Sequence, residues 1–296
     1  MPHPGSVRFK QLLPLRHRFG NTLAPLLFLA LFLTTPVQAD ADGKAVKAKA
    51  PKLAIVIDDV GYNLHRAEEI MALPVELTLG MLPYAPFAQQ IAERAAVHGR
   101  EIILHQPMEA VAERKQEPGT LKLAMSAERF DAQFTDALAQ LPNVTGVNNH
   151  TGSLLTAHRV PMEWLMAGIA RRGLYFLDSR TTPHSVAERT ARAHAVPTIR
   201  RDVFLDHVRS PAHIEAAFER GLAIARRRGH AVVIAHPYPM TVRFLEERLS
   251  ALPEDVRLST LSALVEEEPV RLRAPADRKA LVLLGNQGSP NISLGQ

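Results

Sequence analysis

The sequence predicts an α/β fold whose parallel sheet closes into a barrel, and three observations support this. Short apolar runs alternate with longer amphipathic stretches over about 200 residues, which is typical of repeated strand–helix units. Several runs are rich in Val and Ile and lack polar alternation, as expected for strands buried on both faces. Finally, seven or eight such units favour a barrel over an open, doubly wound sheet.

The expected elements follow one another along the chain. Strands are expected at Leu53–Ile57, Val75–Met81, Glu101–Leu104, Val144–Asn148, Leu174–Leu177, Val203–Leu205 and Ala231–Ala235, with a weaker eighth at Val256–Leu261. Helices are expected at His65–Ala72, Pro86–His98, Ser126–Gln140, Pro161–Arg172, Pro211–Arg228 and Thr241–Leu252. Gly173 and Gly229 stand at expected helix C-caps, where glycine supplies the left-handed conformation.

The first 39 residues have the pattern of a secretory signal peptide. A basic segment ends at Arg18, the apolar stretch Leu23–Leu33 follows, and residues 37–39 (Val-Gln-Ala) give the small-x-small pattern of a cleavage site. The apolar stretch is shorter than the roughly 20 residues that span a bilayer. We therefore expect cleavage near Ala39, no stable membrane span afterwards, and a periplasmic or secreted protein; an uncleaved membrane anchor is the alternative.

The remaining chain divides into three expected parts. Residues 40–51 are small and charged, without apolar periodicity, and are expected to form a flexible linker. Residues 52–263 carry the strand–helix alternation and are expected to form the barrel domain. Residues 264–296 lose the pattern and are expected to be a mostly disordered tail.

Composition excludes several function classes. The leader holds Arg8, Lys10, Arg16 and Arg18 and no acidic residue, so it contributes +4 of the formal net charge of +5. The chain after the leader is nearly neutral, so its composition does not indicate the basic surface that binds nucleic acid. No phosphate-binding glycine motif predicts a nucleotide site. The absence of cysteine excludes a thiolate metal site and a cysteine nucleophile.

Polar side chains that can perform chemistry follow most of the expected strands at their C-terminal ends. They are Asp58, Asp59, His105, Asn149, His150, Asp178, Ser179, Arg180, Asp206, His207 and His236. In a parallel barrel these ends meet on one face, where active sites are built. Capping and turn preferences could explain single aspartates, but they explain the histidines poorly. The sequence therefore predicts a functional site on this face.

Two carboxylates and two imidazoles in this set suit a divalent metal. Asp58 and Asp59 repel each other, and this repulsion is relieved if one binds a cation while the other acts as a base; a surface turn is the alternative. His105 and His150, with one carboxylate and a position left open for water, form a ligand set suited to catalytic zinc. Glu109, four residues after His105, is a further possible ligand.

His236 is the candidate general acid. It follows an apolar run and precedes Pro237 and Pro239, which restrict the backbone just after the strand end. A histidine that titrates near neutral pH suits proton transfer. A packed or solvated loop histidine is the alternative from this segment alone.

The segment from about Lys52 to Leu261 resembles the polysaccharide deacetylases, and more closely their divergent branch in bacterial envelopes. Residues 56–61 (VIDDVG) are similar to the family's Asp-Asp motif after the first strand. Residues 99–105 (GREIILH) are similar to the second motif, in which another histidine follows four residues later; Glu109 stands at that position here. Residues 232–236 (VVIAH) are similar to the last motif.

This resemblance implies a distorted (β/α)7-8 barrel of the polysaccharide deacetylase type that binds a divalent metal, with zinc expected. Asp58 would be the general base and His236 the general acid. Asp59 and His105 would bind the metal. The third ligand would be His150 or Glu109; we favour His150 because residues 148–153 (NNHTGS) form a distinctive strand-end segment. Three further residues would face the substrate: Asp178, Arg180 and Asp206.

The implied function is metal-dependent hydrolysis in the bacterial envelope. The expected reaction removes acetyl groups from an N-acetylated polysaccharide or oligosaccharide, which is hydrolysis of a C–N bond other than a peptide bond. Envelope glycan is the expected partner, and an ester on envelope glycan is another bond that the same site could cleave. The Glu109 replacement motivates a second alternative, a non-catalytic periplasmic protein that binds glycan or a partner on the same barrel.

Overall fold

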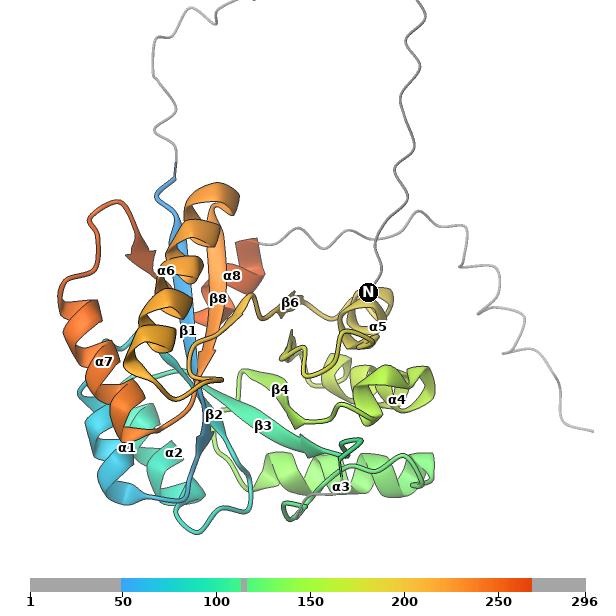
Figure 1. Cartoon of the computed structure of the whole chain (residues 1–296). Coiled ribbons are helices and arrows are strands. Elements are labelled where there is room, and N and C mark those ends of the chain that lie inside the picture. The colour runs from blue at the N-terminus through green and yellow to red at the C-terminus, as the bar shows by residue number, and fades with distance from the viewer. Residues whose placement is uncertain (1–48, 113–115, 268–296) are drawn as a thin grey trace, which may run out of the picture. The chain divides into compact units, whose positions relative to one another are not determined.

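The computed structural model describes residues 49–112 and 116–267 of the chain (Figure 1). The expected signal peptide, the first part of the expected linker and the tail after Glu267 lie outside the described residues. Within the described part, nine parallel strands form one sheet in the order β6-β5-β4-β3-β2-β1-β8-β7, with β9 beside β1. Figure 1 shows α1, α2, α6 and α7 to the left of the strands and α3, α4 and α5 to the right.

The elements lie close to the expected positions. The strands are β1 Lys52–Val60, β2 Thr78–Met81, β3 Ile102–Met108, β4 Gly146–Thr151, β5 Tyr175–Asp178, β6 Thr198–Arg200, β7 Val203–Phe204, β8 His230–Ala235 and β9 Arg257–Leu258. The helices are α1 Leu64–Met71, α2 Ala88–Val97, α3 Ala127–Ala139, α4 Arg159–Ala170, α5 Ala187–Ala193, α6 Pro211–Arg228, α7 Pro239–Ser250 and α8 Leu261–Glu267, with a 3₁₀ turn η1 at Leu155–Ala157. Four elements were not expected from the sequence: η1, α5, β6 and α8.

The sheet curls into a barrel that stays open along one line. β6 and β7 lie at opposite ends of the hydrogen-bonded path, yet only Arg201 and Asp202 separate them in the chain. Three consecutive peptide links span at most about 11 Å, so the two outer strands must lie close together. The gap between β6 and β7 is called the seam below. The predicted distorted barrel is confirmed, with the seam as its opening.

Strand side chains alternate between two apolar clusters. On β1, Leu53 and Ile55 pack into the large cluster that the surrounding helices cover. Ala54 and Val56 belong to a smaller cluster inside the barrel, which includes residues of β3, β5 and β8. Positions with the same parity as Ala54 therefore face the interior, and the next such position on β1 is Asp58.

Helix α8 closes the end of the barrel at which β1 begins. Its buried residues Leu264 and Val265 belong to the inner cluster. Its first backbone N–H groups, those of Leu261 and Ser262, donate to the carboxylate of Glu101 over 2.9 and 3.2 Å. A carboxylate at a helix N-terminus satisfies these otherwise unpaired donors and interacts favourably with the helix dipole. With this end sealed, the opposite end of the barrel is left for the site.

Helix α8 also corrects the expected domain boundary. The tail was expected to begin at residue 264, but the helix continues to Glu267 and buries Leu264 and Val265. The interior of a curled barrel needs apolar side chains at its closed end, and periodicity within one short segment does not reveal that need. The folded part therefore extends past residue 263.

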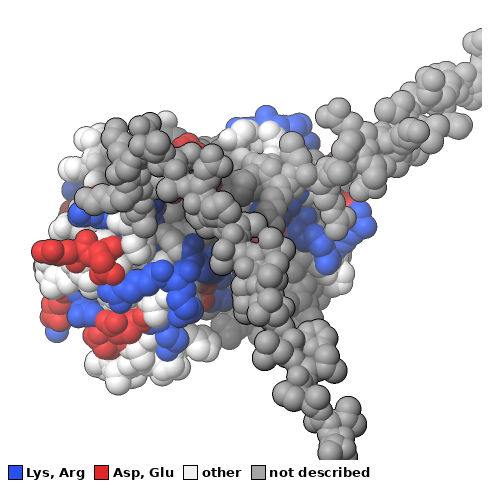
Figure 2. All heavy atoms as spheres, turned by 90° about the horizontal axis from the view of Figure 1, so that it is seen from above, with Lys and Arg blue, Asp and Glu red and all other residues white. Residues whose placement is uncertain are grey.

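Two further properties of the described residues concern membrane spans and surface charge. Across residues 49–112 and 116–267, no helix has the length and hydropathy needed to cross a bilayer. Figure 2 shows Lys and Arg side chains next to Asp and Glu side chains on the face that it presents. This mixture agrees with the nearly neutral composition of the chain after its leader.

Candidate functional site

A β-bulge in β1 brings two consecutive aspartates to the open end of the barrel. The pairing of β1 with β2 shifts between Ile57 and Val60, and Asp59 adopts the left-handed conformation at φ 57°. Consecutive residues of a regular strand face opposite sides, whereas a bulge can turn both toward one side. The bulge therefore lets Asp58 and Asp59 reach the same site, and a strained backbone of this kind is often retained where function requires it.

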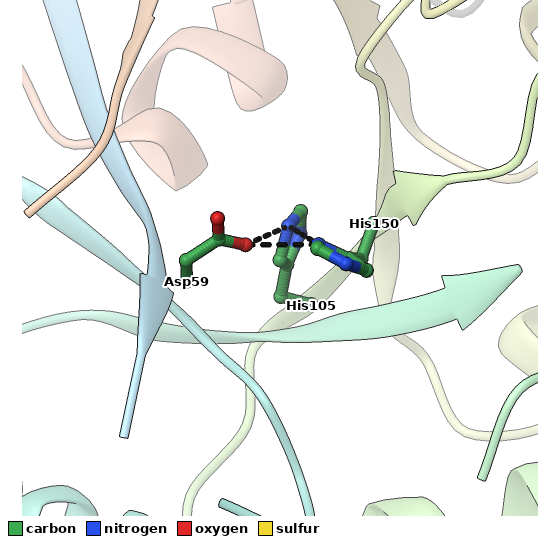
Figure 3. Close-up of side chains that lie close together, drawn as sticks. All are labelled: Asp59, His105 and His150. Atoms are coloured by element: carbon green, nitrogen blue, oxygen red, sulfur yellow. Dashed lines mark hydrogen bonds and ion pairs between the residues drawn. The ribbon is translucent and has the colours of Figure 1, made fainter. Parts of the chain in front are cut away.

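Asp59, His105 and His150 point toward one another at this end (Figure 3). Asp59 Oδ1 lies 3.2 Å from His105 Nε2 and 2.8 Å from His150 Nδ1. The two imidazole nitrogens lie 3.0 Å apart. Ligand atoms around a tetrahedral zinc ion, with bonds of about 2.0–2.2 Å, lie about 3.3 Å apart. Small outward movements of the three side chains would therefore accommodate the ion.

Two further observations support a cation at this position. Asp59 Oδ1 is buried, and its close neighbours are the ring nitrogens of His105 and His150, which are themselves metal-ligand atoms. Burial alone would raise the pKa of Asp59, but hydrogen bonds and charges from His105 and His150 outweigh burial and hold this pKa far below its usual range. Asp59 is therefore ionised and ready to bind a metal. The residues present fit a divalent metal ion.

Asn148 fixes which nitrogen of His105 is free to bind. The Asn148 amide donates to both carboxylate oxygens of Asp58, over 2.9 and 3.0 Å. Its carbonyl oxygen therefore faces His105 Nδ1, at 2.8 Å, and Nδ1 must carry the proton. The lone pair of a neutral His105 is then on Nε2, directed at Asp59 and His150. Sequence reasoning did not single out Asn148, although it stands two residues before His150 and so faces the same side of β4.

Asp58 is almost completely buried, at 2% exposure, and lies beside the three possible ligands. Burial raises its pKa; the charges of His105 and His236 and the hydrogen bond from Asn148 offset only part of that effect. A carboxylate with a raised pKa accepts a proton more readily near neutral pH. Asp58 therefore has the properties of a general base.

Gly80 on β2 provides the space for the Asp58 carboxylate. A Cβ atom at position 80 would lie 2.0 Å from Asp58 Oδ1. We therefore expect Gly80→Ala to displace Asp58 and to lower the free energy of unfolding by about 1–3 kcal/mol, as overpacked cores usually do. Urea denaturation measures this. Gly221→Ala, in α6 and away from the site, is the matched control, because a Cβ atom there would lie 3.0 Å from Val233 Cγ2, a much milder contact than at position 80. Equal stability of Gly80→Ala and wild type would contradict the expectation.

His236 is oriented by Asp206 from behind. The Asp206 carboxylate lies 2.8 Å from His236 Nδ1, accepts the His236 backbone N–H over 2.8 Å, and accepts the Thr241 hydroxyl over 2.9 Å. His236 Nε2 is directed toward the cluster, 4.0 Å from Asp59 Oδ2. Burial lowers the pKa of His236, but the Asp206 hydrogen bond and charge, helped by Asp59 and Asp58, raise it to about 9. The imidazole is therefore charged at neutral pH and can act as an acid.

We expect Asp206→Asn to lower the pKa of His236 from about 9 to below its usual value, since burial would then be opposed by fewer charges. NMR titration of the imidazole, in protein kept metal-free by a chelator, measures this directly. The folded-state pKa lies above the unfolded value near 6.5, so the pair's full stabilisation is present below about pH 6.5 and is lost as the pH rises through 9. The stability difference between wild type and variant should shrink over that window. An unchanged titration of His236 would contradict the role of Asp206.

The other residues expected at the site hold the surrounding loops. Glu109 Oε2 accepts the backbone N–H of Leu123 over 2.8 Å and is not part of the ligand cluster, whereas His150 is. Asp178 is fully buried, and its oxygens accept from Arg180 N, Ser185 Oγ and Glu188 N. Asp206 lies behind His236. Arg180 lies at the seam, away from the ligand cluster, and lines a cavity described below.

The comparisons with known proteins agree with this geometry. The model of the divergent polysaccharide deacetylase family matches residues 55–265, most of the chain. The chain belongs to this family. Two relatives of this chain are uncharacterized proteins. YibQ of Escherichia coli is 37% identical over 226 residues, 76% of this chain and 71% of YibQ. A Haemophilus influenzae protein is 39% identical over 219 residues, 74% of this chain and 78% of that protein.

A solved structure also resembles this deacetylase-family barrel. The crystal structure of an uncharacterized protein from Agrobacterium tumefaciens matches with a TM-score of 0.70 and 27% identity, covering 74% of this chain and 90% of the other. The matched family segment spans β1 to α8, so it includes every residue of the Asp59–His105–His150 cluster as well as Asp58 and His236. The site described above therefore lies within the part of the chain that the family shares.

Proposed function

We propose that this protein is a zinc-dependent hydrolase that removes acetyl groups from an N-acetylated glycan of the bacterial envelope. The observation that carries the proposal is the grouping of three metal-ligand atoms, from Asp59, His105 and His150, beside a buried carboxylate and a charged imidazole. Carbonyl hydrolysis at a catalytic zinc site uses such a set: an ion with an open position, a base and an acid.

The chain's own groups divide the proton transfers between them. A zinc ion held by the three ligands supplies a Lewis acid and lowers the pKa of water from about 16 toward 7. Asp58, held by Asn148, takes the proton of the water that attacks the acetamide carbonyl. His236, charged through Asp206, gives its proton to the nitrogen of the leaving amine as the C–N bond breaks and acetate is released. Each proton transfer contributes about 10²–10⁴-fold to the rate.

The expected leader supports the cellular part of the proposal. Residues 1–39 have a basic segment, an apolar stretch and a cleavage-site pattern, so we propose export to the periplasm or the medium, where envelope glycan is available. The non-catalytic alternative was motivated by the loss of a motif histidine at Glu109. The non-catalytic alternative has less support in this arrangement, because His150 offers a third ligand atom. Glu109 instead accepts the backbone N–H of Leu123.

The test is release of acetate from N-acetylated oligosaccharides and, in parallel, from O-acetylated glycan. The purified protein is assayed as isolated, after chelation, and after zinc is restored. Zinc-restored release from N-acetylated substrates supports the proposal, and release from O-acetylated glycan alone would move the activity to ester bonds. No release from any substrate by a zinc-loaded protein would favour the non-catalytic binding protein instead.

A further inference from the structure

A second cavity opens at the seam of the barrel, apart from the metal-ligand cluster. It has a volume of about 430 Å³ and lies between the end of β5, the β6–β7 connection and α6. This cavity is called the seam pocket below. Its wall carries five groups that are basic or can become so: Arg180, Arg201, Arg220, His207 and His213.

Positive charge predominates among the residues that line the seam pocket. Asp202 is the single carboxylate among the residues that line the seam pocket. It already pairs with Arg228, at 2.5 Å, and accepts the backbone N–H of Val232 over 2.9 Å. None of the pocket's three arginines forms an ion pair with a described carboxylate, although the charge of the buried Asp178 acts on Arg201.

The two inner arginines are held in place by backbone carbonyls. Arg201 donates from Nε to Ser179 O over 2.7 Å and from Nη2 to Arg180 O over 2.9 Å. Arg180 makes only two long contacts, at 3.4 Å, to the carbonyls of Ser185 and Pro183, and its own backbone is strained at φ 49°. Burial lowers the pKa of Arg201 to about 10; the charge of Asp178 opposes this effect and the charge of Arg180 adds to it. An anion would relieve this repulsion.

Arg220 stands at the rim and is available to a ligand. It lies on α6, is exposed, and has no hydrogen bond or ion pair with any described residue. The planar guanidinium fork matches the oxygen atoms of carboxylate and phosphate groups, which makes arginine the usual partner of such oxyanions. A fixed inner pair and a free outer arginine form a site into which an oxyanion can enter.

We propose that the seam pocket binds an oxyanion, a phosphate or a carboxylate, that is carried by a carbohydrate. Phe204 connects the pocket with the metal-ligand end of the barrel. Arg201 lies over its ring at 3.7 Å, and His236 stacks on the same ring with centroids 6.0 Å apart. An acidic sugar anchored at the arginines would thus extend toward His236. This last step rests on the proposed function, whereas anion binding in the pocket does not.

The experiment is a calorimetric titration of the purified full chain at low salt, with a chelator present so that no ligand binds through a metal. The probes are glucose 1-phosphate, glucuronate, inorganic phosphate and, as the neutral control, glucose. The test variant is Arg220→Gln. The matched control is Arg227→Gln, which removes an exposed arginine from the same helix without touching the pocket.

Saturable binding of glucose 1-phosphate and glucuronate, but not glucose, is expected. Arg220→Gln should weaken it about tenfold, as loss of one hydrogen bond to a charged group does, while Arg227→Gln should leave it unchanged. Tighter binding of glucose 1-phosphate than of inorganic phosphate identifies a sugar-borne anion, and equal binding identifies free phosphate, which overturns the carbohydrate part. Absence of anion binding, or equal losses in both variants, overturns the site. Because no turnover is measured, these outcomes are independent of whether the hydrolase proposal holds.

Discussion

Replacing His105 and His150 together by alanine is expected to abolish metal binding. The double variant leaves Asp59 as one carboxylate ligand, and changes even behind the ligands of a metal site typically weaken binding 10–100-fold. Elemental analysis after incubation with zinc should find one equivalent in wild type and none in the variant. His98→Ala is the control, because His98 is an exposed residue at the end of α2 and should leave the metal content unchanged.

The same measurement decides the hydrolase proposal. If wild type binds no metal even after zinc is supplied, the carboxylate and the two imidazoles do not form a metal site, and the proposed reaction loses its Lewis acid. If the double variant retains one equivalent of zinc, the metal lies elsewhere, and the assignment of Asp59, His105 and His150 is wrong.

Asp58→Asn is expected to retain the metal and to lose about 10²–10⁴-fold in the rate of acetate release. Asp58 is not one of the clustered ligand atoms, so its replacement leaves the three ligands in place. The carbonyl oxygen of asparagine can still accept from Asn148, which keeps the geometry, but an amide does not take a proton near neutral pH. Turnover and metal content, measured on the same preparation, separate these effects.

A matched control for this prediction is Asp255→Asn. Asp255 is an exposed aspartate that forms an ion pair with Arg226 and has no contact with the metal-ligand cluster. The Asp255→Asn substitution removes one negative charge, as Asp58→Asn does, and should leave both turnover and metal content unchanged. Wild-type turnover in Asp58→Asn would show that another group accepts the proton.

The barrel and the location of its site could be predicted from the sequence because both depend on repeated local patterns. Unbroken apolar runs such as Leu53–Ile57 predict buried parallel strands, and polar residues after several such runs must meet at one face. Asp59, His105 and His150 were found in this way. Strand periodicity also places Asn148 on the side of His150, so this signal was present in the sequence although it was not used.

Features that depend on packing between distant segments could not be predicted. The bulge that turns Asp58 and Asp59 together requires the register between β1 and β2. The need for Gly80 appears only when the Asp58 carboxylate lies against it. Asp178 and Asp206 stand at strand ends like Asp59, but their oxygens bind backbone and neighbouring side chains. Aspartate suits both roles, so its position alone does not distinguish a ligand from a residue that holds a loop.

The position of β1 has a consequence for how this chain reaches its native state. β1 is the first strand, yet its neighbours include β8 and β9, so Lys52 pairs with both His230 and Arg257. The hydrogen bonds of this central strand can therefore be completed only after the last part of the chain is present. Pairing between segments so far apart in sequence slows folding. During synthesis, the chain should therefore stay sensitive to proteases until β8 has been made and has paired with β1. Deletion of the segment from β8 to α8 should unfold the whole barrel rather than leave a smaller folded barrel.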